Sequence, residues 1–261
     1  MNRYFLELAY KGTKYSGFQV QENAITIQSE VEKAFSTFFR KEFRMTGSSR
    51  TDAGVHALQN FFHFDSEEII EERSVYNINS ILPDDIVVKS ITLMNSLEDG
   101  HVPHARFDAI SRAYRYFIGR NKDPFNKETV LYYPYKLDID RLQECGLLLK
   151  EYTDFTSFSK KNTQVKTFNC SIAESNWIID DGMLIYYVKA NRFLRGMVRA
   201  LVGTMLQVGR NKISVEEFRS IIDARDCSRA DFSAAAHGLF LVEVKYPENF
   251  FPLKSSSDRY F

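Results

Sequence analysis

The sequence predicts an α+β protein, with a mixed or antiparallel sheet flanked by helices and two halves forming a central basic cleft near residue 105. Three observations favour this class. Some apolar segments alternate as strands do, while others recur every three or four residues as helices do. Strand and helix segments do not alternate strictly, so a parallel βαβ arrangement is not indicated. The 261 residues, 44% of them apolar, are enough to bury a sizeable core.

Strands are expected wherever a short apolar or alternating segment is bounded by turn residues. The first such segment, Tyr4–Tyr10, ends in the turn-prone Lys11-Gly12-Thr13. The pattern predicts strands over residues 4–10, 43–46, 58–64, 86–93, 113–118, 165–177, 183–190 and 239–246.

Helices are expected where apolar residues recur at spacings of three and four. The pattern predicts helices over residues 26–40, 138–150, 193–208 and 214–224. In the third segment, Arg192, Arg195 and Arg199 follow the same spacing, so we expect them to share one side of that helix. A cationic edge beside a core-facing stripe suits the wall of a cleft.

The chain divides into two α+β regions and a short tail. Residues 1–105 form the N-terminal half, which carries the candidate reactive loop described below, and residues 106–247 form the C-terminal half. Residues 248–261 are expected to be a tail, with Lys254–Ser257 as a frayed end.

Composition excludes several classes of protein. The 34 basic and 34 acidic residues cancel, so overall charge indicates no partner. No signal peptide is recognisable and no apolar run approaches about 18 residues, which predicts a cytoplasmic protein without a membrane span. The three cysteines are too widely spaced for a CxxC metal site and odd in number, so we interpret them as reduced thiols.

The basic residues are unevenly distributed, in three stretches at 40–50, 106–122 and 189–212. The last stretch holds six basic residues and no acidic ones, and the middle one interleaves arginines with Tyr114 and Tyr116. Guanidinium groups beside flat rings suit phosphate contacts and base stacking. The alternative is that these stretches are simply solvated faces of strands and helices.

The polar loop Gly47–His56 offers the clearest candidate chemistry. It places the Asp52 carboxylate among small residues, two positions after Arg50. Small neighbours would let a substrate approach the carboxylate, and a nearby guanidinium would keep it ionised and nucleophilic. The alternative is a turn in which Asp52 bonds its own backbone.

The sequence lacks the residues that a metal site, a phosphate-binding P-loop or a serine nucleophile with its base would need. His101 and His104 are separated by Pro103, and no cysteine or carboxylate cluster accompanies them, so no metal site is expected. The loop lacks the Gly-Lys-Ser/Thr of a P-loop. Ser48, Ser49 and His56 lie too close together in the sequence for a convincing nucleophile and base. We therefore expect neither a metal nor any other cofactor.

One family resemblance covers most of the chain. The segment Gly47-Ser48-Ser49-Arg50-Thr51-Asp52-Ala53-Gly54-Val55-His56-Ala57 resembles the signature of the tRNA pseudouridine synthase A family. Further segments resemble the family's other motifs in the same order: Tyr10–Gln19, His104–Phe107 with Arg112–Tyr116, Asp154–Phe158, Asn191–Arg199 and Gly238–Leu241. The resemblance spans about residues 4–246. Lys11 and Phe18 depart from it, standing where the family usually has Asp and Trp, and Ala235-Ala236-His237 stands where the family has Ala-Pro-Ala.

The resemblance implies the pseudouridine synthase fold and a cofactor-free isomerase. The substrate would be uridine at positions 38, 39 and/or 40 in the anticodon stem-loop of tRNA, and the protein would be a homodimer. Asp52 matches the catalytic nucleophile, and Arg199 matches the arginine that pairs with it. Arg50 matches the residue that displaces and holds the target nucleotide, and Tyr114 the ring that stacks on the target uracil.

Two other functions fit the same residues. A non-catalytic RNA-binding protein would use the basic stretches without converting a base. A carboxylate-dependent N-glycosidase would use Asp52 to release free uracil.

Overall fold

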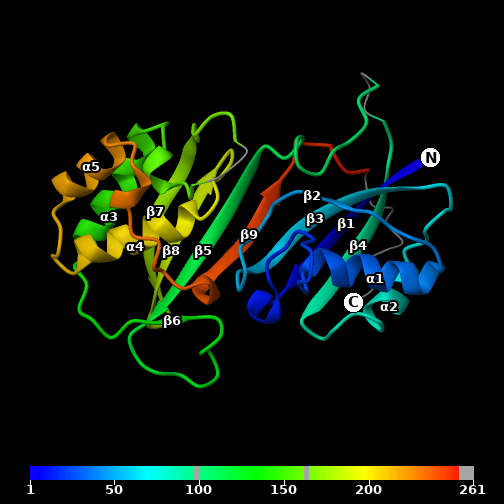
Figure 1. Ribbon diagram of the computed structural model, residues 1–261, viewed down its shortest axis with the longest axis horizontal. Helices are drawn as coiled ribbons and strands as arrows, with labels where there is room; N and C mark the ends of the chain where they lie inside the picture. Colours follow the sequence, from blue (N-terminus) through cyan, green and yellow to red (C-terminus); the bar gives the residue numbers. More distant parts are fainter. Residues whose placement is uncertain (97–99, 162–164, 253–261) are drawn as a thin grey trace.

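The computed structural model describes residues 1–96, 100–161 and 165–252, and a mixed β-sheet runs through them (Figure 1). Its strands lie in the order β4-β1-β3-β9-β5-β8-β7, with β2 beside β3 and β6 beside β5. The bounds are β1 (Asn2–Tyr10), β2 (Thr46–Gly47), β3 (His56–Ser66), β4 (Ile86–Met94), β5 (Ser111–Gly119), β6 (Leu131–Tyr132), β7 (Ile172–Asp180), β8 (Met183–Ala190) and β9 (Leu239–Lys245).

Most neighbouring strands are antiparallel, but two pairs are parallel. β9 runs parallel to β3, with His56 opposite Phe240 and Ala57 opposite Leu241, and β6 runs parallel to β5. The predicted mixed sheet and α+β class are therefore confirmed. The last strand among the described residues, β9, lies between β3 and β5, so the sheet continues from the N-terminal to the C-terminal strands. The division at residue 105 and the central cleft stay predictions.

Helices gather at the two ends of the sheet (Figure 1). Their bounds are α1 (Ile27–Phe39), α2 (Ser74–Asn79), α3 (Ile139–Leu148), α4 (Met197–Gly209) and α5 (Val215–Asp223). The side chain of Thr26 caps α1, which buries Ile27, Val31 and Phe35. The Phe35 ring meets Phe64 of β3 edge-on at 5.4 Å, and this contact holds α1 against the sheet.

Some predicted elements were misplaced. The strand expected over 43–46 is confined to Thr46–Gly47, and the one expected over 165–177 begins only at Ile172. The helix expected from residue 193 begins at Met197, after Gly196 adopts a left-handed φ of 75°. Arg192 and Arg195 therefore precede the helix, and the prediction that they share its face with Arg199 was wrong. The short helix α2 was not predicted.

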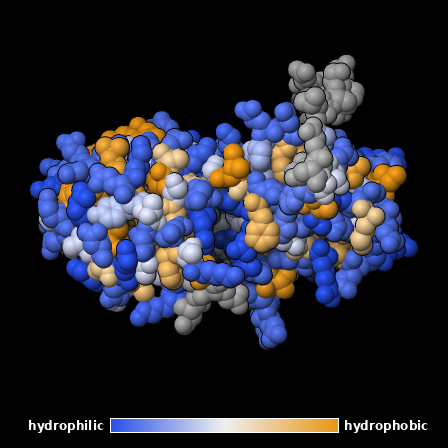
Figure 2. Space-filling view, turned by 90° about the horizontal axis from the view of Figure 1, so that it is seen from above, coloured by the Kyte–Doolittle hydropathy of each residue, from blue (hydrophilic) through white to orange (hydrophobic). Residues whose placement is uncertain are grey.

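The C-terminal segment returns to the N-terminal strands. Phe250 is buried, and its ring lies 5.4 Å from Phe5 of β1 and 4.7 Å from Tyr246. Residues 254–257, predicted to fray, lie outside the described residues. Over residues 1–96, 100–161 and 165–252, no helix has both the length and the apolar character needed to span a membrane. The surface in Figure 2 is mainly hydrophilic, with hydrophobic residues scattered across it.

Candidate active site

The predicted reactive loop joins β2 to β3 and holds Asp52 near the middle of the sheet. Backbone hydrogen bonds fix it on both sides of the carboxylate: Phe18 N–H donates to the Thr51 carbonyl at 3.1 Å, and Val55 N–H donates to the Asp52 carbonyl at 3.1 Å. The Asp52 side chain is 24% exposed, so solvent still reaches it. The loop does form a turn, which was the alternative to a reactive loop. The hydrogen bond that closes the turn is accepted by the backbone carbonyl of Asp52, so the carboxylate remains available.

A buried network of hydrogen bonds connects this loop to the sheet. The hydroxyls of Tyr10 and Thr51 lie 2.8 Å apart, and the Asn60 amide donates to the Tyr10 hydroxyl at 3.2 Å and to the Ser49 carbonyl at 2.9 Å. Tyr10 belongs to β1 and Asn60 to β3. Two neighbouring strands therefore set the position of residues 49–51, immediately before Asp52.

His56 locks the other end of the loop. Its Nε2–H faces the carbonyls of Glu128 and His237 at 2.9 and 3.0 Å, while its Nδ1 accepts from Gly12 N–H at 3.1 Å. This arrangement requires the neutral ring, and burial lowers the pKa of His56 accordingly. Both ring nitrogens are thus engaged by backbone groups, so His56 positions the loop and does not serve as a base.

Arg199 approaches Asp52 from α4. One of its terminal nitrogens, Nη1, lies 3.8 Å from Asp52 Oδ2, while its Nε donates to the Ala234 carbonyl at 2.7 Å. The Arg199 side chain is only 18% exposed. The ion pair joins the loop after β2 to a helix almost 150 residues later, and it involves Arg199 rather than the sequence neighbour Arg50.

Tyr114 of β5 lies close enough to Asp52 to be affected by its charge. Burial is the main cause that raises the pKa of Tyr114 above its usual value, and the nearby Tyr10 and the Asp52 carboxylate raise it further. The Tyr114 ring is 8% exposed and meets Phe193 edge-on at 5.0 Å. The hydroxyl therefore stays protonated, and the ring stands beside an aromatic residue that precedes α4.

Arg50 acts electrostatically on another arginine. It is exposed, and the charges of Arg50 and Arg192 add to burial in lowering the pKa of Arg106. The structure thus pairs Asp52 with Arg199 and leaves Tyr114 within reach of the Asp52 charge, while the Arg50 charge acts on Arg106. The sequence predicted no role at the site for Arg106 or Arg192 beyond their basic stretches and motif segments.

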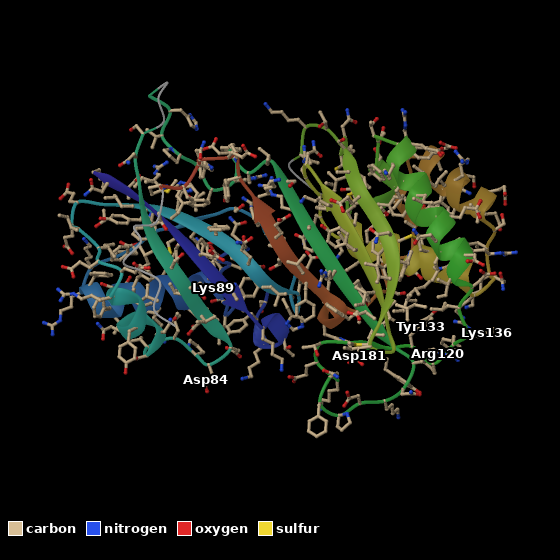
Figure 3. The ribbon with its side chains drawn as sticks, turned by 180° about the vertical axis from the view of Figure 1, so that it is seen from behind. Asp84, Lys89, Arg120, Tyr133, Lys136 and Asp181 are labelled. Carbon is tan, nitrogen blue, oxygen red and sulfur yellow. The ribbon has the colours of Figure 1, made fainter. Side chains whose placement is uncertain are left out.

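Two cavities in the described part of the chain lie elsewhere. One of about 480 Å³ is lined by residues that include Asp84 and Phe240, and one of about 300 Å³ by residues that include Tyr133 and Ala234. Figure 3 labels Asp84 and Tyr133 on opposite halves of the molecule. Asp52 lines neither of these two cavities. Among the described residues no cluster of three His, Cys, Asp or Glu side chains could hold a metal ion.

Known proteins similar to this chain share nearly its whole length. Residues 152–247 match the family model described as tRNA pseudouridine synthase. A protein of Parabacteroides distasonis named tRNA pseudouridine synthase A is 43% identical over 258 residues, covering 97% of this chain and 100% of the relative. Proteins of the same name from Porphyromonas gingivalis and Bacteroides thetaiotaomicron are 45% and 44% identical, each over 96% of this chain and over 100% and 93% of the relative. The chain belongs to the tRNA pseudouridine synthase A family.

The three residues named as departures from the family motifs lie outside the reactive loop itself. Lys11 pairs with Glu128 at 2.5 Å, next to the carbonyl that His56 contacts. Phe18 stacks on Phe62 at 4.6 Å. His237 contributes its backbone carbonyl, which any residue supplies. In this member of the tRNA pseudouridine synthase A family, therefore, the departures affect support for the loop and leave Asp52 and Arg199 in contact.

Proposed function

We propose that the protein is a tRNA pseudouridine synthase that isomerises uridine 38, 39 and/or 40 in the anticodon stem-loop. The observation that carries this proposal is the 3.8 Å contact between Asp52 and Arg199, two mostly buried groups from distant parts of the chain. Full-length relatives named tRNA pseudouridine synthase A support the same function.

The reaction needs one carboxylate. In the proposed mechanism an Asp52 oxygen attacks ribose C1′, and the bond from C1′ to uracil N1 breaks with its electron pair leaving on the uracil. The detached base turns in the site, and C5 then attacks C1′ and releases the carboxylate. The proton on C5 is finally lost, and N1 gains one. Atoms and charge balance without an oxidant or a co-reactant.

The proposal gives each remaining residue a physical role. A carboxylate in a partly buried site is costly to keep charged, and the Arg199 guanidinium offsets that cost. The buried Tyr114 ring stacks on the target uracil and replaces part of the stacking that the base loses when it leaves the helix. Arg50, exposed on the same loop, holds the displaced nucleotide.

The proposed partners are the anticodon arm of tRNA and a second copy of this chain. The basic stretches at 40–50, 106–122 and 189–212 would contact phosphates, so binding should weaken as salt rises. The cytoplasm is the proposed compartment. The buried thiols of Cys145 and Cys170 are free, and burial raises their pKa values to about 12 and 11, which supports inert reduced cysteines.

The test is to incubate the purified protein, without added metal or nucleotide, with an unmodified tRNA transcript that carries uridines at 38–40. Pseudouridine is mapped afterwards by a chemistry specific for it. We expect conversion at one or more of these positions, and none in a transcript with cytidines there. Tight binding without conversion would indicate an RNA-binding protein instead, and free uracil would indicate an N-glycosidase.

A further inference from the structure

Arg112 joins two loops that are far apart in the sequence. It lies in β5, two residues before Tyr114. Its Nη1 donates to the carbonyls of Ala109 at 2.8 Å and Asn191 at 3.2 Å, and its Nη2 donates to the carbonyl of Arg106 at 2.7 Å. Three of its five N–H groups are therefore used by backbone oxygens, and they tie the segment before β5 to the segment before α4.

Each of these two segments carries an arginine, Arg106 before β5 and Arg192 before α4, and the charge of Arg50 also acts on Arg106. The bonded carbonyls belong to Arg106 itself and to the residue before Arg192. Burial lowers the pKa of Arg106, and the positive charges of Arg50 and Arg192 lower it further, so each of these two guanidinium groups lies within electrostatic reach of Arg106. Within residues 1–96, 100–161 and 165–252, none of the three has a carboxylate oxygen within 4.0 Å.

Three neighbouring guanidinium groups without a carboxylate repel one another until an anion joins them. Phosphate oxygens match the guanidinium geometry, and such contacts are short and strong. Aromatic rings accompany the arginines: Arg106 lies over the Phe107 ring at 5.7 Å, and that ring is 73% exposed. Phe193, next to Arg192, contacts the Tyr114 ring. The group thus combines a phosphate-binding charge with surfaces on which bases stack.

We propose that Arg112 is a positioning residue that holds the segments of Arg106 and Arg192 together, so that these arginines form one binding site for the RNA backbone beside the target nucleotide. Arg112 acts through the loops, because three of its five N–H groups are engaged by backbone carbonyls. The inference rests on the proposed function, because it takes tRNA as the ligand.

The test measures binding of an unmodified tRNA transcript to Arg112→Gln over a series of salt concentrations. We expect affinity at 0.15 M salt to fall about tenfold and the salt slope to become shallower by about one to two phosphate contacts. The control is Arg219→Gln, which removes the same charge from α5, outside the three basic stretches, where the guanidinium pairs with Glu151. It should change neither quantity.

Two further variants separate positioning from folding. Arg106→Gln and Arg192→Gln should each reduce the salt slope, and adding either change to Arg112→Gln should cost less than the sum of the single effects. A lower melting temperature with an unchanged salt slope, or an Arg112→Gln protein that does not fold, would assign Arg112 to stability and overturn the inference. Wild-type protein that binds tRNA without converting it would defeat the proposed function and leave this binding comparison intact.

Discussion

At the scale of single residues, Arg199 is held by two contacts at once. Its Nε donates to the Ala234 carbonyl while Nη1 lies 3.8 Å from Asp52. The first contact fixes the plane of the guanidinium, and the second places its charge beside the carboxylate. A lysine could not supply both, because it presents one rotatable ammonium in place of a planar fork.

Arg199→Gln is expected to reduce the turnover number about 100-fold, because the carboxylate loses the preorganised charge that stabilises it. Affinity for tRNA should change little. Single-turnover kinetics at saturating tRNA would measure this effect. Arg195→Gln is the matched control, since Arg195 is an exposed arginine that precedes α4. Equal losses in both variants would remove the special role of Arg199.

The reactive loop could be predicted from the sequence because its signal is local. Small residues surround one carboxylate in Gly47–His56, and a resemblance paired that carboxylate with Arg199. The supports of the loop carried no such signal. Tyr10 had the pattern of an ordinary strand residue, and its bond to Thr51 depends on how β1 and β3 are aligned. The contact between Arg199 and Ala234 likewise arises only in the folded chain.

At the scale of elements, the turn after β1 is packed directly against the reactive loop. A Cβ atom on Gly12 would lie 2.0 Å from the carbonyl oxygen of Val55, so only glycine fits at this position. The Gly12 N–H also donates to His56 Nδ1. The first turn of the chain therefore determines where the loop carrying Asp52 ends.

Gly12→Ala is expected to lower the free energy of unfolding by about 2 kcal/mol and to slow turnover, because backbone must move away from the new methyl group. Urea denaturation and single-turnover kinetics would measure the two effects. Gly146→Ala in α3 is the control: the added Cβ would meet ordinary contacts at 3.4 Å and beyond, and a helical alanine should stabilise by about 0.5–1 kcal/mol. A destabilised Gly146→Ala beside an unaffected Gly12→Ala would contradict the packing described for both glycines.

The start of α4 shows why element boundaries were less predictable than elements. The apolar stripe continues from Phe193 to Val208 without interruption, which favours one helix. The backbone at Gly196 turns left-handed and ends that continuity, and sequence periodicity carries no information on φ. The late start of α4 matters for the site. Arg192 and Phe193 lie in a loop before the helix, and Arg112 donates to the Asn191 carbonyl in that loop.

At the scale of the whole molecule, strand β9 unites regions that are far apart in the sequence. It pairs with β3, which follows the reactive loop, and with β5, which carries Tyr114. This placement could not be read from the sequence, because strand order depends on long-range pairing. A second long-range contact involves His63 of β3, whose Nδ1 accepts from Ala105 N–H at 3.1 Å and whose ring lies 4.4 Å from His104.

Stability should fall in mild acid because of His63. Burial, aided by the nearby His104 and Arg3 charges, lowers the pKa of His63 to about 4 from an ordinary value of 6.5, although Asp65 and Asp108 oppose the shift. Between these two values the unfolded chain binds a proton that the folded protein does not. The free energy of unfolding should therefore decrease by about 3 kcal/mol as pH falls from 6.5 to 4. Urea titrations at several pH values would measure this, and His63→Gln should show a smaller decrease. Equal slopes for both proteins would contradict it.

The central claim is that Asp52 is the nucleophile of a tRNA-modifying isomerase, and Asp52→Asn tests it most directly. Pseudouridine formation and tRNA affinity are measured side by side in the variant and the wild type. We predict that turnover falls about 10⁴-fold or more while affinity stays close to wild type, because the amide keeps the shape of the carboxylate and loses its nucleophilic charge. Pseudouridine formation by Asp52→Asn at a rate near wild type would contradict the claim.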